Sequence, residues 1–421
     1  MIALVLCVLC SLVQAADAGP AKPTSEQSAW QDLELGMFIH FAPNTWQDKE
    51  GDEQTTPLDA INPAQLDTEQ WVDVAEQMGA KYIVFVAKHV GGFCMWQTDT
   101  TDYSIKNTAW RGGKGDVLGD LAASCKKRNM GLGVYLSPRD DHLGAGTSGR
   151  CDTPDAQAKY NEIYRRQLTE VLSRYGSMME VWFDGSNVIE VGDILAQYAP
   201  KAMIFQGKYA TIRWVGNEDG TAPYPAWNAV SKQAWQKGAT AADGDPDGEV
   251  WLPNECDARI RNTWFWNTHN ADRLKPVDRL MEMYYRSVGH GAMLLLNHTP
   301  DTTGRIPEAD AKRGAGFGAE IKRRFGQSVA ETAGNGNELV LRLNGPARID
   351  HVVLMENIAE GERVREYVVE GQADGRWQEL AKGSAIGHKK IDRITPVTVD
   401  AVRLRVIKSA GEPQIRRMAV N

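Results

Sequence analysis

Short apolar runs rich in β-branched and aromatic residues alternate with helical patterns along the first 326 residues of the chain. This alternation predicts an α/β fold with a parallel sheet. Eight such runs occur, and eight parallel strands are the number that closes a (β/α)8 barrel. The predicted strands are Met37–Phe41, Tyr82–Lys88, Gly131–Pro138, Glu180–Gly185, Ala202–Gly207, Arg213–Glu218, Val250–Asp257 and Ala292–Asn297.

Between these strands, apolar residues recur at the three- and four-residue spacing of amphipathic helices. The fifth and sixth strands are separated by too few residues for a helix, so we expect an irregular (β/α)8 TIM-like barrel over residues 16–330. The predicted helices are Thr68–Met78, Asp116–Lys127, Tyr160–Tyr175, Pro276–Val288 and Glu308–Phe325.

After Gln327 the helical period is lost, and short strands separated by Gly, Asn and Asp turns predict a C-terminal all-β sandwich over residues 331–421. The polar stretch 331–338 suits a junction or the turn before the first strand. This domain either packs on the barrel or binds glycan. Its predicted strands are Glu338–Leu343, Arg348–Met355, Arg365–Gly371, Trp377–Lys382, Lys389–Ile391, Pro396–Val397, Ala401–Ile407 and Ile415–Val420.

The first fifteen residues form an apolar run that ends at Ala15, which resembles a signal peptide with a small-residue cleavage site. The run is too short for a comfortable membrane span. We therefore expect a secreted or periplasmic protein, with a lipid anchor on Cys10 as the second reading. The four remaining cysteines form no CxxC motif, and both disulfides and free thiols stay open; they are Cys94, Cys125, Cys151 and Cys256.

The net charge of −8 argues against a nucleic acid or an anionic membrane as partner and fits a neutral substrate. Thirteen tryptophans are compatible with sugar stacking and equally with an ordinary core. We expect no metal, because no HxH or HExxH spacing occurs, and we expect no cofactor.

Polar residues end most of the predicted strands, and barrel enzymes carry their chemistry at the carboxyl ends of the strands. Asp184 ends the fourth strand and Glu218 the sixth, whereas Glu255 and Asp257 end the seventh. Two acids on facing strand ends are what cleavage of a glycosidic bond requires. The alternatives without a catalytic role are that Asp184 caps a helix, that Glu218 is a solvated loop acid, and that the other two acids pair with nearby arginines.

Two histidines and three tryptophans complete this candidate site. His40 and His89 end the first two strands and could exchange hydrogen bonds with sugar hydroxyls, although a satisfied core histidine is the commoner case. An apolar wall, or ordinary barrel packing, would come from Trp182, Trp264 and Trp266.

Several of these stretches, in the same order, resemble glycoside hydrolase family 29, the α-L-fucosidases. The resemblance covers residues 28–326 and is specific because many short motifs recur in one order. The matching stretches are Gly36–Phe41, Ala80–His89, Gly131–Pro138, Val181–Gly185 with its Trp-Phe-Asp-Gly, and Leu294–Asn297 with Pro300-Asp301 and Gly304–Pro307.

The resemblance implies a retaining exo-α-L-fucosidase that acts on fucosylated oligosaccharides or glycoconjugates. Asp184 would be the nucleophile, and Glu218 the acid/base, with Glu255 as fallback. Arg213–Glu218 and Trp251–Asp257 resemble the branch that acts on α-1,3 and α-1,4 linkages. The implied substrate-binding residues are His40, His89, Trp182, Trp264, Trp266 and Asp257.

One departure from the family pattern affects the expected sugar. Many members read Lys-His-His-Asp-Gly-Phe after the second strand, whereas this chain has Val90 and Gly91 in place of the second His and the Asp. The departure therefore leaves open a glycosidase for a galactose-configured or modified sugar. Two alternatives come from other classes: a catalytically silent glycan-binding protein, against which the presence of both Asp184 and Glu218 speaks, and a metal-dependent hydrolase that uses the histidines and acids, against which the missing HxH and HExxH spacing speaks. The oligomeric state is left open.

Overall fold

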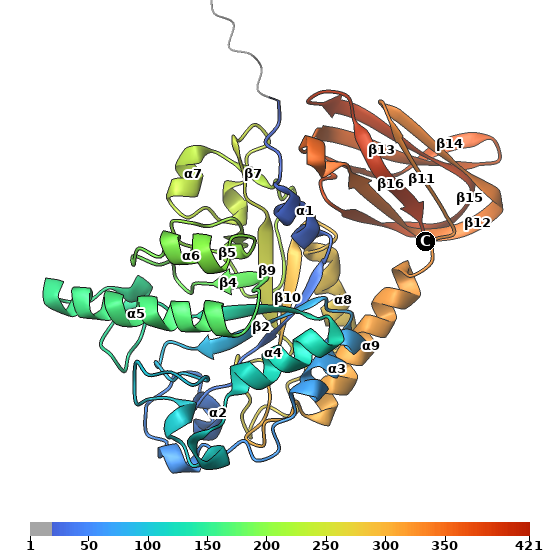
Figure 1. Ribbon diagram of the computed structural model, residues 1–421. Coiled ribbons are helices and arrows are strands. Elements are labelled where there is room, and N and C mark those ends of the chain that lie inside the picture. Colours follow the sequence, from blue (N-terminus) through green and yellow to red (C-terminus); the bar gives the residue numbers. More distant parts are fainter. Residues whose placement is uncertain (1–18) are drawn as a thin grey trace, which may run out of the picture.

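The computed structural model describes residues 19–421, so the predicted signal peptide, residues 1–15, lies outside the described part of the chain. A parallel barrel surrounded by helices is followed by an antiparallel β domain (Figure 1). The long helix α9 (Glu308–Phe325) leads from the barrel into that domain.

Eight parallel strands form the barrel, in the order β5-β4-β3-β2-β1-β10-β9-β6. One parallel bridge between Phe205 and Ile212 brings the two outer strands together, so the barrel is nearly closed. The predicted TIM-like barrel is confirmed. Its strands are β1 (Leu35–Ile39), β2 (Tyr82–Lys88), β3 (Gly131–Leu136), β4 (Glu180–Trp182), β5 (Met203–Phe205), β6 (Arg213–Trp214), β9 (Asn254–Arg259) and β10 (Met293–His298).

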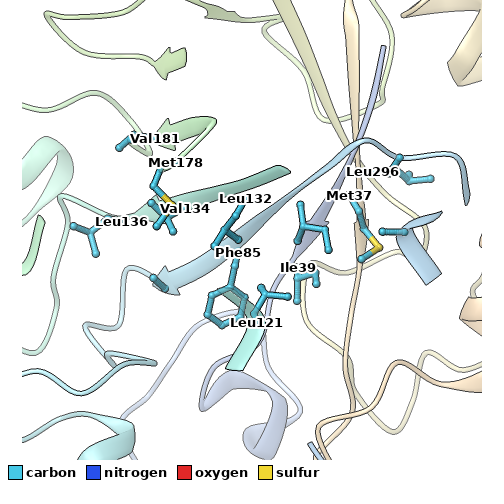
Figure 2. Close-up of a cluster of buried hydrophobic side chains, with 14 of the residues drawn as sticks. Met37, Ile39, Phe85, Leu121, Leu132, Val134, Leu136, Met178, Val181 and Leu296 are labelled. Carbon is cyan, nitrogen blue, oxygen red and sulfur yellow. The ribbon is translucent and has the colours of Figure 1, made fainter. Parts of the chain in front are cut away.

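Alternate residues of each strand face opposite sides, which gives the barrel two separate cores. Phe38, Val84 and Tyr135 belong to the interior cluster. Their neighbours in sequence pack outward against the helices, and Figure 2 shows several of them, including Val134, and Phe85 beside Leu121 of α4. Strand-end residues of the interior set therefore point into the barrel mouth.

The helices around the barrel begin at side-chain caps. Asp67, Asp116 and Thr153 each accept a hydrogen bond from a backbone N–H in the first turn of α3, α4 and α5. Residues 206–212, between β5 and β6, contain no helix, as the short spacing predicts. The described α-helices are α1 (Ser25–Gln31), α2 (Asn44–Gln47), α3 (Thr68–Met78), α4 (Val117–Arg128), α5 (Pro154–Arg174), α6 (Gly192–Tyr198), α7 (Lys232–Gln236), α8 (Val277–Arg286) and α9.

The predicted strand Val250–Asp257 is wrong as a single element. β8 (Val250–Trp251) pairs with β7 (Ala229–Val230) in a small antiparallel sheet, and only β9 belongs to the barrel. Pro253 stands between them, and a proline lacks the N–H that would continue a ladder.

The C-terminal domain is one antiparallel sheet in the order β11-β16-β12-β15-β13-β14, which encloses its own apolar core. The prediction of separate short strands is wrong for the two longest, because the β12–β15 register shifts twice and each strand continues past the irregularity. The strands are β11 (Ala330–Asn335), β12 (Glu338–Glu356), β13 (Val364–Ala373), β14 (Arg376–Gly383), β15 (Lys390–Ser409) and β16 (Gln414–Val420).

The stretch 331–338, expected to be a junction or the turn before the first strand, instead contributes most of β11. Its residues alternate between half-buried and exposed positions and pair with β16. A strand at the edge of a sheet tolerates polar and glycine residues because only one face is covered.

The β domain packs tightly on the barrel. Val353, Met355 and Ile391 belong to the same apolar cluster as the barrel strands. Lys389 Nζ lies 2.8 Å from both carboxylate oxygens of Glu34, directly in front of β1. The two domains therefore share a core.

Cysteines 94, 125, 151 and 256 are all free thiols. Within residues 19–421, no helix is both long and apolar enough to cross a membrane.

Candidate active site

The candidate residues meet at the carboxyl end of the barrel strands. Tyr135 lies in β3, and Asp184 follows β4 by two residues. His40 and His89 come directly after β1 and β2. Glu218 lies four residues beyond the end of β6, so it is on a loop and not at the strand end that we predicted.

A bulge at the end of β2 decides which way His89 points. The β2–β3 register shifts between Val86 and Lys88. Lys88 consequently turns away from the interior, and its ammonium lies 2.8 Å from Asp140 Oδ2 and 3.0 Å from Gln167 Oε1. His89 then occupies the inward position, with its ring stacked on Tyr135 at 5.8 Å.

Asp184 is a half-buried carboxylate with one hydroxyl donor. Tyr135 Oη donates to Asp184 Oδ2 over 2.8 Å. Burial raises the pKa of Asp184, the hydrogen bond from Tyr135 lowers it, and the negative charge of Glu218 raises it. The influence of Glu218 on this pKa shows that the two acids lie in one electrostatic environment.

Glu218 is the more exposed of the two acids. The indole Nε1 of Trp264 donates to its Oε2 over 3.1 Å, and the Arg259 guanidinium lies 3.3 Å from the same oxygen. Arg259 also covers the ring of Trp264, at 5.0 Å from the centroid. Glu218 therefore keeps a defined position while its side chain remains 45% exposed.

Both histidines are held neutral by burial. Burial lowers the pKa of His40 well below its usual range and that of His89 to about 4. Asn297 Nδ2 donates to a backbone carbonyl, so its Oδ1 accepts from His40 Nδ1 at 2.8 Å. In this orientation His40 Nε2 carries a free lone pair.

Aromatic rings connect the two acids around the pocket. The ring of His40 lies 5.8 Å from His89 and 4.9 Å from Trp264. The ring beside both histidines is Phe265, at 5.3 and 5.0 Å, whereas its neighbour Trp266 is a half-buried loop residue with no ring contact to this cluster. The structure thus brings His40, His89, Trp264, Asp184 and Glu218 together.

Glu255 lies deeper, on the floor of the barrel. Trp182 Nε1 donates to Glu255 Oε1 over 2.8 Å, and Tyr82 Oη donates to Oε2 over 3.1 Å. Burial raises the pKa of Glu255 to about 7, and burial next to Glu255 raises that of Glu180. The negative charge of Glu255 adds to burial in raising the pKa of Glu180, so one of the two carboxyl groups retains its proton near neutral pH.

Two other candidates support the pocket from below. Trp182 is stacked between Phe205 at 3.8 Å and Tyr135 at 5.3 Å, and it is 6% exposed. Asp257 is buried, accepts from Trp214 Nε1 over 2.7 Å, and has its pKa raised by burial to about 8. Both therefore shape the floor.

The Val90-Gly91 departure has a structural counterpart in a distant loop. A Cβ atom added to Gly91 would lie 2.5 Å from the Cβ and Oδ2 of Asp52. Asp52 is held there by Tyr103 Oη at 2.7 Å and by Gln47 Nε2 at 2.8 Å. A carboxylate from residues 48–54 thus fills the space where a side chain at position 91 would begin.

The same loop fixes the tryptophan wall. The Glu50 carboxylate accepts from the backbone N–H of Trp264 at 3.0 Å and of Phe265 at 3.3 Å. These bonds position Trp264, whose indole reaches Glu218.

Sequence reasoning missed Tyr135 and Phe265 as parts of the pocket, whereas Asn297 is expected at the end of the eighth strand, at the barrel mouth. Strand alternation could have found Tyr135, because its neighbour Val134 is an outward core position. No local pattern distinguishes Phe265 from Trp266 in an irregular loop. Among residues 19–421, no group of three His, Cys, Asp or Glu side chains is arranged to hold a metal ion.

A family model described as alpha-L-fucosidase matches residues 46–323. The chain is 32% identical to alpha-L-fucosidase 1 of Arabidopsis thaliana, over 93% of this chain and 86% of that protein.

Solved structures agree with this family match. One from Bacteroides thetaiotaomicron superposes with a TM-score of 0.89 at 32% identity, over 95% of this chain and 99% of that one. A family 29 fucosidase from Ruminococcus gnavus, solved in complex with fucose, gives a TM-score of 0.85 at 29% identity, over 96% of both chains.

Proposed function

The chain belongs to the alpha-L-fucosidase family of glycoside hydrolases, and we propose that it removes terminal α-linked L-fucose from glycans with retention of configuration. The observation that carries this proposal is the pair of unlike acids at one barrel mouth. Asp184 is half-buried and bound by Tyr135, whereas Glu218 is exposed and bound by Trp264.

The hydrogen bond from Tyr135 favours the ionised form of Asp184 that must attack, against the effect of burial, and Glu218 is exposed enough to reach a leaving oxygen and water. In the first step Asp184 attacks the anomeric carbon, the bond to the leaving oxygen breaks, and Glu218 gives that oxygen a proton. In the second step Glu218 takes a proton from water, whose oxygen attacks the anomeric carbon and releases Asp184. Neutral His40 and His89 are suited to bind the sugar hydroxyls.

Glu218 is a better acid/base than Glu255 for reasons of access. Glu255 is fully buried, and its two oxygens are bound by Trp182 and Tyr82 beneath the pocket. A general acid must come within hydrogen-bond reach of the leaving oxygen.

The nucleophile is tested with Asp184→Ala. We expect loss of turnover, and rescue by azide with formation of a fucosyl azide of inverted configuration. Wild-type activity in this variant would contradict the assignment.

The acid/base is tested with Glu218→Gln against Glu255→Gln as the matched buried control. We expect Glu218→Gln to hydrolyse 4-nitrophenyl α-L-fucoside far better than a natural linkage, because an activated leaving group needs little protonation. If Glu255→Gln shows this pattern instead, the role belongs to Glu255.

The finer specificity is also part of the proposal. The likeness of Arg213–Glu218 and Trp251–Asp257 to the α-1,3/1,4 branch supports cleavage of those linkages. A panel of α-1,2-, α-1,3-, α-1,4- and α-1,6-fucosylated oligosaccharides, with a β-D-galactoside beside them, tests both the linkage and the sugar. Faster release of galactose than of fucose would favour the altered-sugar alternative.

We further propose that residues 1–15 direct secretion. N-terminal sequencing of the mature protein from the medium or periplasm should begin at Ala16. A protein that retains Met1 in the cytoplasm would contradict this.

A further inference from the structure

The proposed acid Glu218 stands on a long loop that is attached to the β domain. Residues 215–228, which we call the Glu218 loop, cross from β6 to β7 without forming a helix. Among residues 19–421, the carboxylate of Glu218 is held by two side chains, those of Trp264 and Arg259. Its position therefore depends on what fixes the backbone of this loop.

The first half of the loop runs back along the barrel, from the mouth toward the amino ends of the strands. Asp219 pairs with Ala258 near the carboxyl end of β9. Ala222 then donates to Arg286 O at 2.7 Å, and its carbonyl accepts from His290 Nδ1 at 3.0 Å, where α8 leads into β10. A six-residue strand is about 20 Å long, and the six residues that follow Glu218 reach no further, so this segment has little slack.

Tyr224 ends this segment in the β domain. Its hydroxyl donates to the carbonyl of Ala385 at 2.8 Å and accepts from the backbone N–H groups of Ser384 and Ala385, both at 3.1 Å. A hydroxyl offers one proton and two lone pairs, and all three are used here. Gly383 leaves room for this contact, because a Cβ atom there would overlap with Tyr224 Oη. Tyr224 is 36% exposed, so these polar contacts fix it more than burial of its ring does.

Two further contacts attach the end of the loop to the β domain. The guanidinium of Arg365, in β13, lies 4.8 Å from the ring centroid of Trp227. The Glu362 carboxylate accepts from Asn228 N at 3.0 Å and from Asn228 Nδ2 at 2.7 Å. The loop is thus fixed at three places within five residues.

A tight turn carries the position of this anchored part to the acid. Asn217, the residue before Glu218, donates from Nδ2 to Thr221 O at 3.0 Å. Its Oδ1 accepts from Asp219 N, also at 3.0 Å. Glu218 therefore lies inside a turn that cannot move independently of the segment that ends at Tyr224.

The segment of the nucleophile has no such attachment. Among residues 19–421, no hydrogen bond joins residues 183–191, which include Asp184, to the β domain. A displacement of the β domain contacts would consequently affect one acid of the pair and not the other.

We propose that the β domain positions Glu218 through this loop, with Tyr224 as the positioning residue. This inference rests on the proposed fucosidase function and deepens it. A general acid must come within hydrogen-bond reach of the leaving oxygen, and a misplacement of about 1 Å can cost up to about 100-fold in rate. The β domain would thereby support proton transfer to the leaving oxygen, while the attack by Asp184 is unaffected.

The test compares two leaving groups in Tyr224→Phe, which lacks only the anchoring hydroxyl. We expect kcat/KM for a Lewis-type fucosylated trisaccharide to fall about tenfold, mainly through kcat, because no contact to substrate is removed. For 4-nitrophenyl α-L-fucoside kcat/KM should change less than about twofold, since nitrophenolate leaves with little protonation.

The second step of the reaction gives another readout. Azide attacks the anomeric carbon of the fucosyl-enzyme, the ester bond to Asp184 breaks, and no proton has to be removed. Azide should therefore raise kcat of Tyr224→Phe on 4-nitrophenyl α-L-fucoside and give a fucosyl azide of retained configuration. Wild type, whose Glu218 is in place to activate water, should respond much less.

Tyr285→Phe is the matched control. The Tyr285 hydroxyl also crosses the domain boundary, at 2.6 Å from His351 Nε2 of β12, but it does not belong to the loop. This variant should keep the wild-type ratio of the two substrates and show no added response to azide. Glu362→Gln, which weakens the attachment at Asn228, should shift the ratio in the direction of Tyr224→Phe and decides the question if Tyr224→Phe folds poorly. A wild-type ratio in both loop variants, or the same shift in Tyr285→Phe, would overturn the proposal.

Hydrogen–deuterium exchange tests the positioning without reference to activity. Peptides covering residues 215–222 should exchange faster in Tyr224→Phe than in wild type, whereas peptides covering residues 180–190 should not. Unchanged exchange on the loop would contradict the proposal. Failure of wild type on every fucoside would refute the proposed function, and the exchange result would still show whether the β domain fixes the loop.

Discussion

At the scale of single residues, the hydroxyl of Tyr135 controls how easily Asp184 ionises. It is the strongest of the influences that lower the pKa of Asp184, and it acts against burial and the charge of Glu218. The ring beneath that hydroxyl also stacks between His89 and Trp182. One side chain therefore sets both the charge and the floor of the pocket.

Removal of this hydroxyl should shift the pH profile. Asp184 must be ionised to attack, so activity is lost as the pH falls through its pKa. In Tyr135→Phe that pKa rises further, so the acidic limb of kcat/KM moves to higher pH and kcat falls by about 10- to 100-fold. Tyr164→Phe, whose hydroxyl donates to the backbone of β3 from the outer face, is the control and should keep the wild-type limb.

Asp257 should make stability fall with rising pH. Its pKa is about 8 in the folded protein, so the folded form retains a proton that the unfolded chain loses near pH 4. The folded state is therefore weakened as the pH rises through this window. The buried histidines, whose pKa values are lowered, make stability rise with pH only until the unfolded histidines lose their protons near pH 6.5. Above that pH they no longer oppose the effect of Asp257.

Between pH 6.5 and 8 the Tm of wild type should fall further than the Tm of Asp257→Asn, and the two falls should differ by roughly 2 °C or more. The exposed Asp247→Asn is the matched control. Parallel Tm curves for Asp257→Asn and wild type would show that this carboxyl does not titrate in that range.

Sequence reasoning found His40, His89 and Asp184 because they follow predicted strands closely, whereas Glu218 belongs to the site although it lies on a loop beyond β6. His40, His89, Asp184 and Glu218 all lie in one pocket. Asn297 binds His40, which is 257 residues away in the sequence. Phe265 contacts both histidines from a distant loop. No local sequence pattern encodes either contact. Asp52 fills the space next to Gly91 for the same reason of long-range packing.

At the scale of elements, the bulge of β2 is the feature on which the site depends. It turns Lys88 into a buried pair with Asp140, both side chains being at most 1% exposed, and so turns His89 inward. The ladder itself was predictable from the apolar run, but the bulge was not. Its cause is the set of partners that α5 offers to Lys88, namely Gln167 and Tyr160.

We expect Lys88→Met to destabilise the protein by about 3–5 kcal/mol, because it leaves Asp140 buried without its cation. Urea unfolding measures this loss. The double variant Lys88→Met/Asp140→Leu should recover part of it. A Lys88→Met single variant as stable as wild type would mean that the pair does not hold the bulge.

The two longest strands show a second limit of prediction at this scale. Gly345 interrupts the apolar pattern of β12 with a φ of 147°, and the sequence therefore resembles two strands. The chain instead resumes the same ladder against β15, because four residues of β12 between Arg342 and Ala347 bulge out opposite the single residue Asp400.

At the scale of the whole molecule, we expect the two domains to unfold as one unit, because Ile391 of β15 and Met355 of β12 belong to the barrel core. The two-domain layout could be predicted from the loss of helical periodicity after Gln327. The shared core could not be predicted, because its residues have the same apolar pattern as the internal core of the β domain.

Calorimetry of Ile391→Ala tests this unity. We expect a single transition at lower Tm, with a loss of about 2–5 kcal/mol for a truncated core residue. Ile407→Ala, on the same strand but 50% exposed, should change stability by less than about 0.5 kcal/mol. Two transitions, with only one of them shifted, would show independent domains.

The contact between Glu34 and Lys389 has a consequence for folding during synthesis on the ribosome. The two residues are 355 positions apart, so a ribosome adding about 5–20 residues per second makes the first barrel strand roughly 18–70 s before its ionic partner exists. During that interval the seam in front of β1 stays uncovered. The seam is covered only after the chain has been translated through β15, so the barrel depends on the β domain to complete its packing.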